Sequence, residues 1–470
     1  MDNNTVIIQK EKRSIFFSIL LIKALYVALI ILFLPEEWKM FDYDKNINEA
    51  YLAFEIPVLL LESAVFLSYY CRCNPITFLS TVIFCVYIIP VNSTLSLSNY
   101  DWKYYLLSNL FCVVLLLSLG VVARHFPTNV NERETSRLWH SRSFLWIMRV
   151  LTIIVSIGTF FYAYIIQGGI DLSSILSNDM YEQRGEFAEY YITHTNGFLA
   201  YFILVWRGIT STLLLICLYA ALKQKKWLDI ALVLVTYLVL FSLSMEKSTF
   251  LQPIIAFFIY LIEKKHLLSR VSDLFYKGYA ILLAVILIER SILTEETSIL
   301  FKPLVSRLSY MPSYLNHVYY DFFQNKPKIW LTSDFFPFDR FVRIVLPAPY
   351  PEGMVETISE KCFDSLIPSP NTGLFAEAYA QMDIWGIIFF PIAIAIIARI
   401  YSIFADNYGM AGSMILMPIF GLTLANTPVF STMGMVRILI FMIITWLIVK
   451  PINSKLSRRY ESVTYYSNRI

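Results

Sequence analysis

Six cationic side chains lie in or beside long apolar stretches of the sequence, where a charge is unfavourable unless it has a partner. Arginine matches phosphate oxygens with two parallel hydrogen bonds and stays charged when buried. We therefore predict a site for a lipid pyrophosphate near the outer membrane surface, formed by Arg207, Arg437 and Arg290, with Lys247, Arg184 and Arg307 as further candidates. The alternative is that each cation pairs with a nearby carboxylate or snorkels to the membrane surface.

Two other residues could accept a proton from a hydroxyl group. His317 lies in an aromatic-rich segment, and imidazole titrates near neutral pH. Glu377 lies where the chain leaves that segment for an apolar stretch. We predict that one of them acts as a general base. The alternatives are a packed or surface imidazole for His317, and a helix-start carboxylate favoured by the helix dipole for Glu377.

Three charged residues lie inside the first two apolar stretches. Glu55 and Glu62 are seven positions apart and share one face of a helix, and we expect Lys23 near the depth of Glu62 on the adjacent helix. A structural ion pair is the favoured interpretation. The alternative is a proton or substrate path through a transporter.

We expect no metal ion and no other cofactor. The six cysteines are scattered, without a spacing typical of a disulfide framework or a zinc site. Carboxylates predicted outside the membrane, such as Asp334, Asp339, Glu352 and Glu356, also lack tight ligand spacing. The exception is the pair Asp42 and Asp44, which lies in an outer loop of only about fifteen residues. The net charge of +3 says little about partners, and we expect no nucleic acid among them.

The residues above must be positioned by membrane-spanning helices, because the chain is too apolar for a soluble domain. Hydrophobic residues make up 57% of the sequence and charged residues 16%. The apolar stretches are continuous and do not alternate with period two, which favours helices over a barrel. The fold class predicted is an all-α polytopic membrane protein with about twelve spans, at residues 15–34, 50–70, 76–91, 104–123, 144–166, 198–222, 228–244, 249–262, 274–288, 385–404, 410–428 and 435–449.

Basic residues cluster in the short loops of one side when twelve spans are threaded, which predicts that this side and both termini are cytoplasmic. Two enlarged loops, 167–197 and 291–372, then lie outside. The second holds nine of the nineteen prolines and many aromatics, so we expect an ordered, irregular loop with short helices. We therefore predict membrane-spanning helices in 1–166, 198–290 and 373–450, separated by the two enlarged loops and followed by a cytoplasmic tail over 451–470.

The chain resembles the Wzy-type O-antigen polymerases of bacterial inner membranes in three features. These are the layout of spans and loops, the short basic turn SMEKSTFL at 244–251, and the string GLFAEAYAQMDIWG at 373–386. Members of this family are also described with an arginine and a distant glycine in each long loop, and here Arg184 precedes Gly197 and Arg340 precedes Gly353.

The resemblance implies metal-independent glycosyl transfer at the periplasmic face of the bacterial inner membrane. A growing glycan on undecaprenyl pyrophosphate would move onto another lipid-linked oligosaccharide repeat unit, and a chain-length regulator would be a partner. Two alternatives stay open. A flippase or other transporter of lipid-linked glycans would use charges such as Lys23, Glu55 and Glu62, and an O-antigen ligase would share the transfer chemistry.

Overall fold

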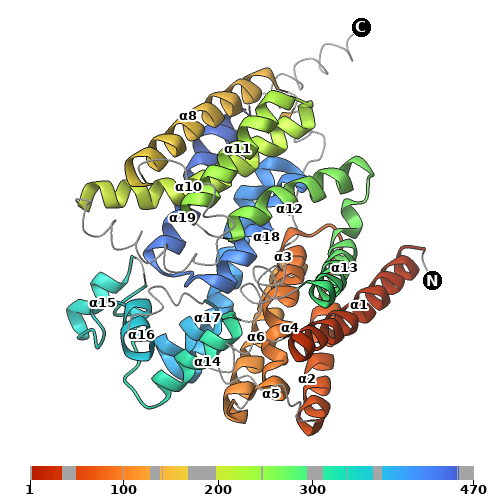
Figure 1. The fold of residues 1–470 in the computed structure, drawn as a ribbon, viewed down its shortest axis with the longest axis vertical. Helices are drawn as coiled ribbons and strands as arrows, with labels where there is room; N and C mark the ends of the chain where they lie inside the picture. Colours follow the sequence, from red (N-terminus) through yellow and green to blue (C-terminus); the bar gives the residue numbers. More distant parts are fainter. Residues whose placement is uncertain are drawn as a thin grey trace. The chain divides into compact units, whose positions relative to one another are not determined.

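The computed structural model describes residues 3–33, 49–98, 100–126, 138–139, 141–167, 197–244, 247–293, 311–335, 337–363, 373–452 and 454. Every element in these ranges is a helix (Figure 1). Eight helices or helix pairs in this part are long and apolar enough to cross a membrane. The described part of the chain is therefore all-helical and is that of a polytopic membrane protein, and the count of about twelve spans stays a prediction.

The chain divides into two compact units, and unit 1 comprises Met1–Pro127, Ser269–Arg399 and Phe420–Thr432. Its helices up to the first enlarged loop are α1 (Asn3–Phe33), α2 (Glu49–Ser68), α3 (Pro75–Ile83), the π-helix η2 (Phe84–Ile88), α4 (Ile89–Asn92), α5 (Thr94–Leu97) and α6 (Trp102–His125). Its later helices are α13 (Val271–Ile292), α14 (Met311–Gln324), α15 (Asp339–Val345), α16 (Met354–Phe363) and most of α17 (Phe375–Ala405). Unit 1 also includes Ser269 and Arg270 of η4 (Leu268–Arg270).

The continuous run α3–η2–α4 forms the centre of unit 1. Every residue from Pro75 to Asn92 is buried. The run begins sharply because the Asn74 side chain accepts hydrogen bonds from the N–H groups of Ile76 and Thr77, while Pro75 has the fixed φ that suits a first turn. Mid-helix π-turns are uncommon and are frequent at functional sites, which draws attention to η2.

The other helices of unit 1 pack around this centre. The red α1 lies along the green α13 in Figure 1, and α2 and α3 both pack on α6. Ser14 of α1 donates to Asp273 of α13 at 2.7 Å. Gly120 of α6 faces Tyr69, whose Cβ would lie 2.6 Å from an added side-chain carbon. Close helix contacts at small residues are expected in a membrane, where lipid gives no hydrophobic drive for helices to associate.

Unit 2 comprises Thr128–Leu268, Ile400–Ile419 and Met433–Ile470. The helices α8, α10 and α11 pack against one another, and α12 packs on α10 and α11. Gly158 of α8 permits this packing, since an added Cβ would lie 2.2 Å from the Trp206 ring of α10. The helices that lie wholly or partly in this unit are α8 (Arg142–Gln167), α10 (Gly197–Gln224), α11 (Trp227–Ser244), α12 (Lys247–Lys264), η6 (Asp406–Tyr408), α18 (Gly409–Asn426), α19 (Thr432–Ile444) and η7 (Thr445–Val449).

The segment 311–363, from the second enlarged loop, contains the short helices α14, α15 and α16. The aromatic side chains of Tyr319, Tyr320 and Phe323 are buried on one face of α14. Cys362, near the end of α16, is exposed, whereas Cys85, Cys112 and Cys217 are buried. Part of the aromatic face of α14 packs on α6 and α17, since the Tyr320 ring lies 5.5 Å from that of Tyr104 and 5.1 Å from that of Tyr379.

Candidate functional site

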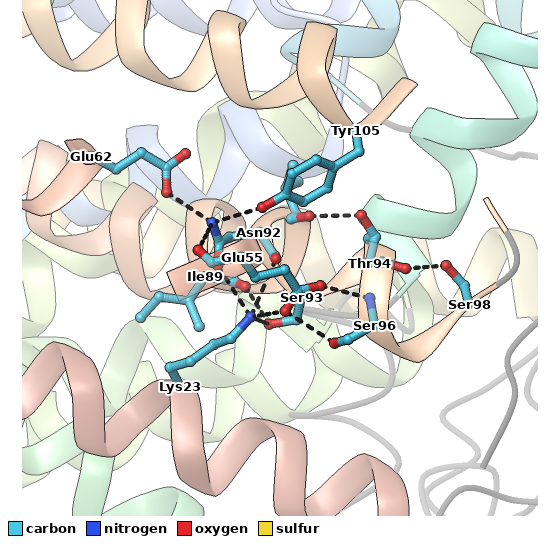
Figure 2. Close-up of polar contacts among 11 residues, drawn as sticks. Lys23, Glu55, Glu62, Ile89, Asn92, Ser93, Thr94, Ser96, Ser98 and Tyr105 are labelled. Atoms are coloured by element: carbon cyan, nitrogen blue, oxygen red, sulfur yellow. Dashed lines mark hydrogen bonds and ion pairs between the residues drawn. The ribbon is translucent and has the colours of Figure 1, made fainter. Parts of the chain in front are cut away.

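A buried polar network crosses the interior of unit 1, centred on Lys23 (Figure 2). The Lys23 ammonium lies 2.6 Å from Glu55 Oε2 and also donates to the Asn92 carbonyl, the Asn92 side chain and the Ser93 hydroxyl, at 2.8–3.2 Å. Glu55 accepts in turn from the N–H and the hydroxyl of Ser96, at 2.7 and 3.0 Å. All of these residues are buried. The ion pair is therefore hydrogen-bonded on both sides, as a buried pair must be to be tolerated.

The second carboxylate of this network is held much less firmly. Lys23 forms its ion pair with Glu55, and Glu62 lies in the same network. Asn92 Nδ2 lies 3.5 Å from one Glu62 oxygen and 3.3 Å from the Tyr105 hydroxyl. Glu62 is fully buried, and its other oxygen has no hydrogen-bond partner among the described residues. The network thus holds one firm ion pair and one loosely bound carboxyl.

The chain itself supplies the acceptors around Lys23, because the helix is interrupted at Ser93 between α4 and α5. Ser93 adopts φ −93° and ψ 1°, outside the helical range. The Asn92 carbonyl is therefore free to accept from Lys23, and the Ser96 N–H is free to donate to Glu55. Interrupted helices at membrane depth occur where the freed backbone groups find partners within the protein.

A second cluster of contacts holds α14 against other helices of unit 1, namely η2, α6 and α17. The hydroxyl of Tyr87, in the π-helix η2, accepts from Asn316 Nδ2 at 2.8 Å and from the Phe375 N–H at 3.2 Å. The Tyr104 hydroxyl donates to the Ser313 carbonyl at 3.0 Å. The π-turn therefore presents a tyrosine that joins α14 to the start of α17.

The string 373–386 forms the start of α17, and its two glycines allow backbone contacts that no other residue could make. A Cβ on Gly373 would lie 2.1 Å from the Leu424 carbonyl oxygen, and one on Gly386 would lie 1.9 Å from that of Ala378. Between them the helix is kinked, with Asp383 at φ 55° and ψ −136°. Such a conformation costs a non-glycine residue about 1–3 kcal/mol and is often found at functional sites.

The kink makes carbonyl groups available, and the segment 311–363 bonds to them. Ile329 N–H donates to the Ala380 carbonyl at 3.0 Å, and Trp330 N–H donates to the Gln381 carbonyl at 2.8 Å. The Gln381 side chain accepts from Leu331 N–H and donates to the Ser333 carbonyl, each at 2.8 Å. The segment is thus fixed to the first turns of α17.

This docking brings charged and aromatic side chains together, which we call the kink cluster: Lys328, Asp383, Tyr320 and Tyr379. The Lys328 ammonium lies 3.9 Å from the centre of the Tyr379 ring and 3.7 Å from Asp383 Oδ1. The Tyr320 ring lies 5.1 Å from that of Tyr379. The Asp383 side chain is 44% exposed, whereas that of Lys328 is 8% exposed. The cluster therefore offers an accessible carboxylate backed by a buried cation and two aromatic rings.

Lys328 and Tyr320 are the two members of the kink cluster that belong to the segment 311–363, and their surroundings shift the pKa of each. Burial lowers the pKa of Lys328, and the Asp383 carboxylate opposes that shift. Burial, followed by the nearby Asp101 carboxylate, raises the pKa of Tyr320 to about 12. Asp383 also contributes to the raised pKa of Tyr320, though less than burial and Asp101 do, and Tyr320 is therefore a neutral phenol at neutral pH.

The two predicted bases are both engaged in packing. Glu377 is fully buried and accepts from the N–H groups of Val429 and Phe430, at 2.8 and 2.9 Å. His317 is stacked on Tyr100, with ring centres 3.9 Å apart, and lies edge-on to Tyr104. A role as base would require Glu377 to release these N–H groups or His317 to leave its stack, and both roles stay predictions.

The predicted pyrophosphate cations are distributed over both units. Arg290, near the end of α13 in unit 1, lies over the Phe33 ring at 5.6 Å and donates to the Leu293 carbonyl at 3.2 Å. Arg437 is partly buried in α19 of unit 2, where α10 contains Arg207 and α12 begins at Lys247. Arg184 and Arg307 lie outside the described residues. Convergence of these cations on one ligand stays a prediction.

Lys328, Asp383 and Tyr87 are not among the site residues predicted from the sequence. Asp383 lies inside the string that carried the family resemblance, directly before an apolar run, so its position was a usable signal. Lys328 is one of many charges in a polar segment, and Tyr87 is one aromatic in an apolar span. Only the fold gives these two residues a distinctive environment.

Among the described residues, no group of three or more His, Cys, Asp or Glu side chains is placed to hold a metal ion. No family model, curated protein or solved structure matches the chain.

Proposed function

We propose that the protein polymerises lipid-linked oligosaccharide repeat units, such as those of an O-antigen, by glycosyl transfer from undecaprenyl pyrophosphate at the periplasmic face of the inner membrane. The observation that supports this most is the kink cluster, where a folded segment between spans meets the start of an apolar helix. A lipid carrier needs an apolar surface, while its sugars need carboxylates and aromatic faces. The kink cluster provides the carboxylate and the aromatic rings, and the exposed Ile384 and Trp385 that follow it on α17 provide the apolar surface.

In the proposed reaction, an acceptor sugar hydroxyl attacks the anomeric carbon of the donor. The new C–O bond forms as the bond to undecaprenyl pyrophosphate breaks, and the hydroxyl proton passes to a base. We propose Asp383 as this base ahead of His317 and Glu377, because its carboxylate is exposed whereas both Glu377 oxygens are occupied. The departing pyrophosphate gains negative charge that cations stabilise, and Arg207, Arg437 and Arg290 stay the residues predicted from the sequence for this role.

The test is deletion of the gene in its host, followed by a gel of the surface glycan. Loss of a polymerase leaves the lipid core with one repeat unit, whereas loss of a flippase or a ligase leaves a bare core. Complementation with Asp383→Asn should also give only one repeat unit, and Asp321→Asn, an exposed carboxylate on α14, should restore long chains. Normal chain lengths with Arg207→Ala or Arg437→Ala would contradict the pyrophosphate assignment.

A second candidate function is transport of lipid-linked glycans, and the Lys23 network favours it. An interrupted helix with charged side chains beside it is the arrangement that many transporters use for a substrate or a coupling ion. Under this proposal, deletion gives a bare core, and repeat units accumulate on the cytoplasmic side.

A further inference from the structure

A pocket of about 260 Å³ lies in unit 2 between α8, α10 and α11. Its charged rim comprises Arg142, Arg149, Lys226 and Asp229. Its apolar wall includes Met148 of α8 and Ala220 of α10. A charged rim above an apolar wall suits a ligand with a polar head and a hydrocarbon body.

The rim carries an excess of positive charge. Three of its four charged residues are cations, and the one carboxylate, Asp229, lies 3.0 Å from Arg149. Arg142 and Lys226 are exposed and form no ion pair with another described residue. Two cationic groups are thus available to an anion, and no described carboxylate neutralises them.

The pocket lies where three helix ends meet. Arg142 is the first residue of α8, and Lys226 lies in the turn between α10 and α11. The side chains of Trp146 and Trp227 at these ends are 68% and 75% exposed. Exposed tryptophans at the ends of apolar helices are typical of the layer between lipid headgroups and hydrocarbon.

The surface of α8 continues from the pocket as an apolar stripe. Trp146, Ile153 and Ile157 lie about one, three and four helical turns after Arg142, so all three share its face of α8. Both isoleucines are exposed, at 43% and 64%. An acyl chain leaving the pocket would therefore find a hydrocarbon surface beneath it.

We propose that this pocket binds the headgroup of an anionic phospholipid, with Arg142 and Lys226 on the phosphate and an acyl chain along α8. The charge excess selects an anion, and the apolar stripe selects a lipid over free phosphate. The sequence assigns this rim to the cytoplasmic side, where basic pockets between spans recognise anionic lipid headgroups. The proposal is independent of the glycosyl-transfer site.

The test measures binding of phosphatidylglycerol and phosphatidylcholine to the purified full chain by native mass spectrometry. Phosphatidylglycerol should bind more tightly than phosphatidylcholine. The double variant Arg142→Gln/Lys226→Gln should weaken phosphatidylglycerol binding about twenty-five-fold, since each interfacial cation contributes about five-fold. The matched control Lys264→Gln/Lys265→Gln removes two exposed lysines at the end of α12 and should leave binding unchanged.

Three outcomes would overturn the proposal. These are equal binding of the two lipids, unchanged binding by the double variant, and inorganic phosphate competing with phosphatidylglycerol as strongly as the lipid itself. If the double variant fails to fold, the salt dependence of lipid binding by the wild-type protein tests the proposal instead. Its phosphatidylglycerol binding should weaken as salt rises, and salt-independent binding would contradict the proposal.

Discussion

At the scale of residues, the pair Lys23–Glu55 decides how unit 1 tolerates charge in its interior. Both side chains are buried, and each is bonded to the backbone of the interrupted helix or to a neighbouring side chain. Removing one member leaves an uncompensated buried charge, whereas removing both leaves neutral groups of similar size.

We therefore expect Lys23→Met to lower the free energy of unfolding by about 3–5 kcal/mol. Lys23→Met/Glu55→Gln should recover much of that loss, because the amide can still accept from the Ser96 N–H. Denaturant unfolding of the purified protein measures both. A double variant as unstable as Lys23→Met would contradict the assignment of the loss to an unpaired Glu55.

Two carboxyls of the segment 311–363 make its stability depend on pH. Burial raises the pKa of Asp334, and burial, followed by repulsion from Asp334, raises that of Glu356. Both groups bind protons more tightly in the folded chain than in the unfolded chain, where their pKa values are about 4. The stability that they contribute is therefore present at low pH and lost as the pH rises through their folded values.

Asp334→Asn should accordingly stabilise this segment at neutral pH and lose its advantage in mild acid. An asparagine can still accept from the Met354 N–H, which lies 2.5 Å from the carboxylate, and it tolerates the Asp334 φ of 55°. Hydrogen exchange of the α16 amides measures the effect at several pH values. Weaker protection of the variant than of the wild type at neutral pH would contradict it.

At the scale of elements, the kinked start of α17 depends on glycine. The carbon that Gly386→Ala adds would lie 1.9 Å from the Ala378 carbonyl oxygen, which is backbone and cannot rotate away. We expect a loss of about 1–3 kcal/mol of unfolding free energy, as for other overpacked sites. Gly278→Ala in α13 is the control, because nothing lies within 4 Å of its added carbon, and it should gain about 0.5–1 kcal/mol.

The helices were largely predictable from the sequence, but the kink was not. The predicted span 76–91 corresponds to the run Pro75–Asn92, and 104–123 corresponds to α6. The predicted span 385–404 misses the first ten residues of α17, which begins at Phe375. Hydropathy finds continuous apolar runs, whereas the break at Asp383 depends on a backbone conformation that its own side chain does not favour.

At the scale of the whole molecule, the sequence separates charges that belong to the membrane interior from those that do not. It selected Lys23, Glu55 and Glu62 from their apolar surroundings, and the structure places all three in one network. The contact between Lys328 and Asp383 could not be predicted from the sequence, because it follows from the docking of one segment on another. Such long-range contacts have no local sequence pattern.

The exposed thiol of Cys362 turns the orientation of the chain into a measurable property. A membrane-impermeant maleimide added to intact spheroplasts should alkylate Cys362 if 311–363 faces the periplasm, and Cys362→Ser should abolish that labelling. Partial desolvation of the sulfur raises the pKa of this thiol, so a mildly alkaline medium will speed the reaction. Modification only after the spheroplasts are broken would place the kink cluster on the same side as the ribosome, away from any glycan assembled outside.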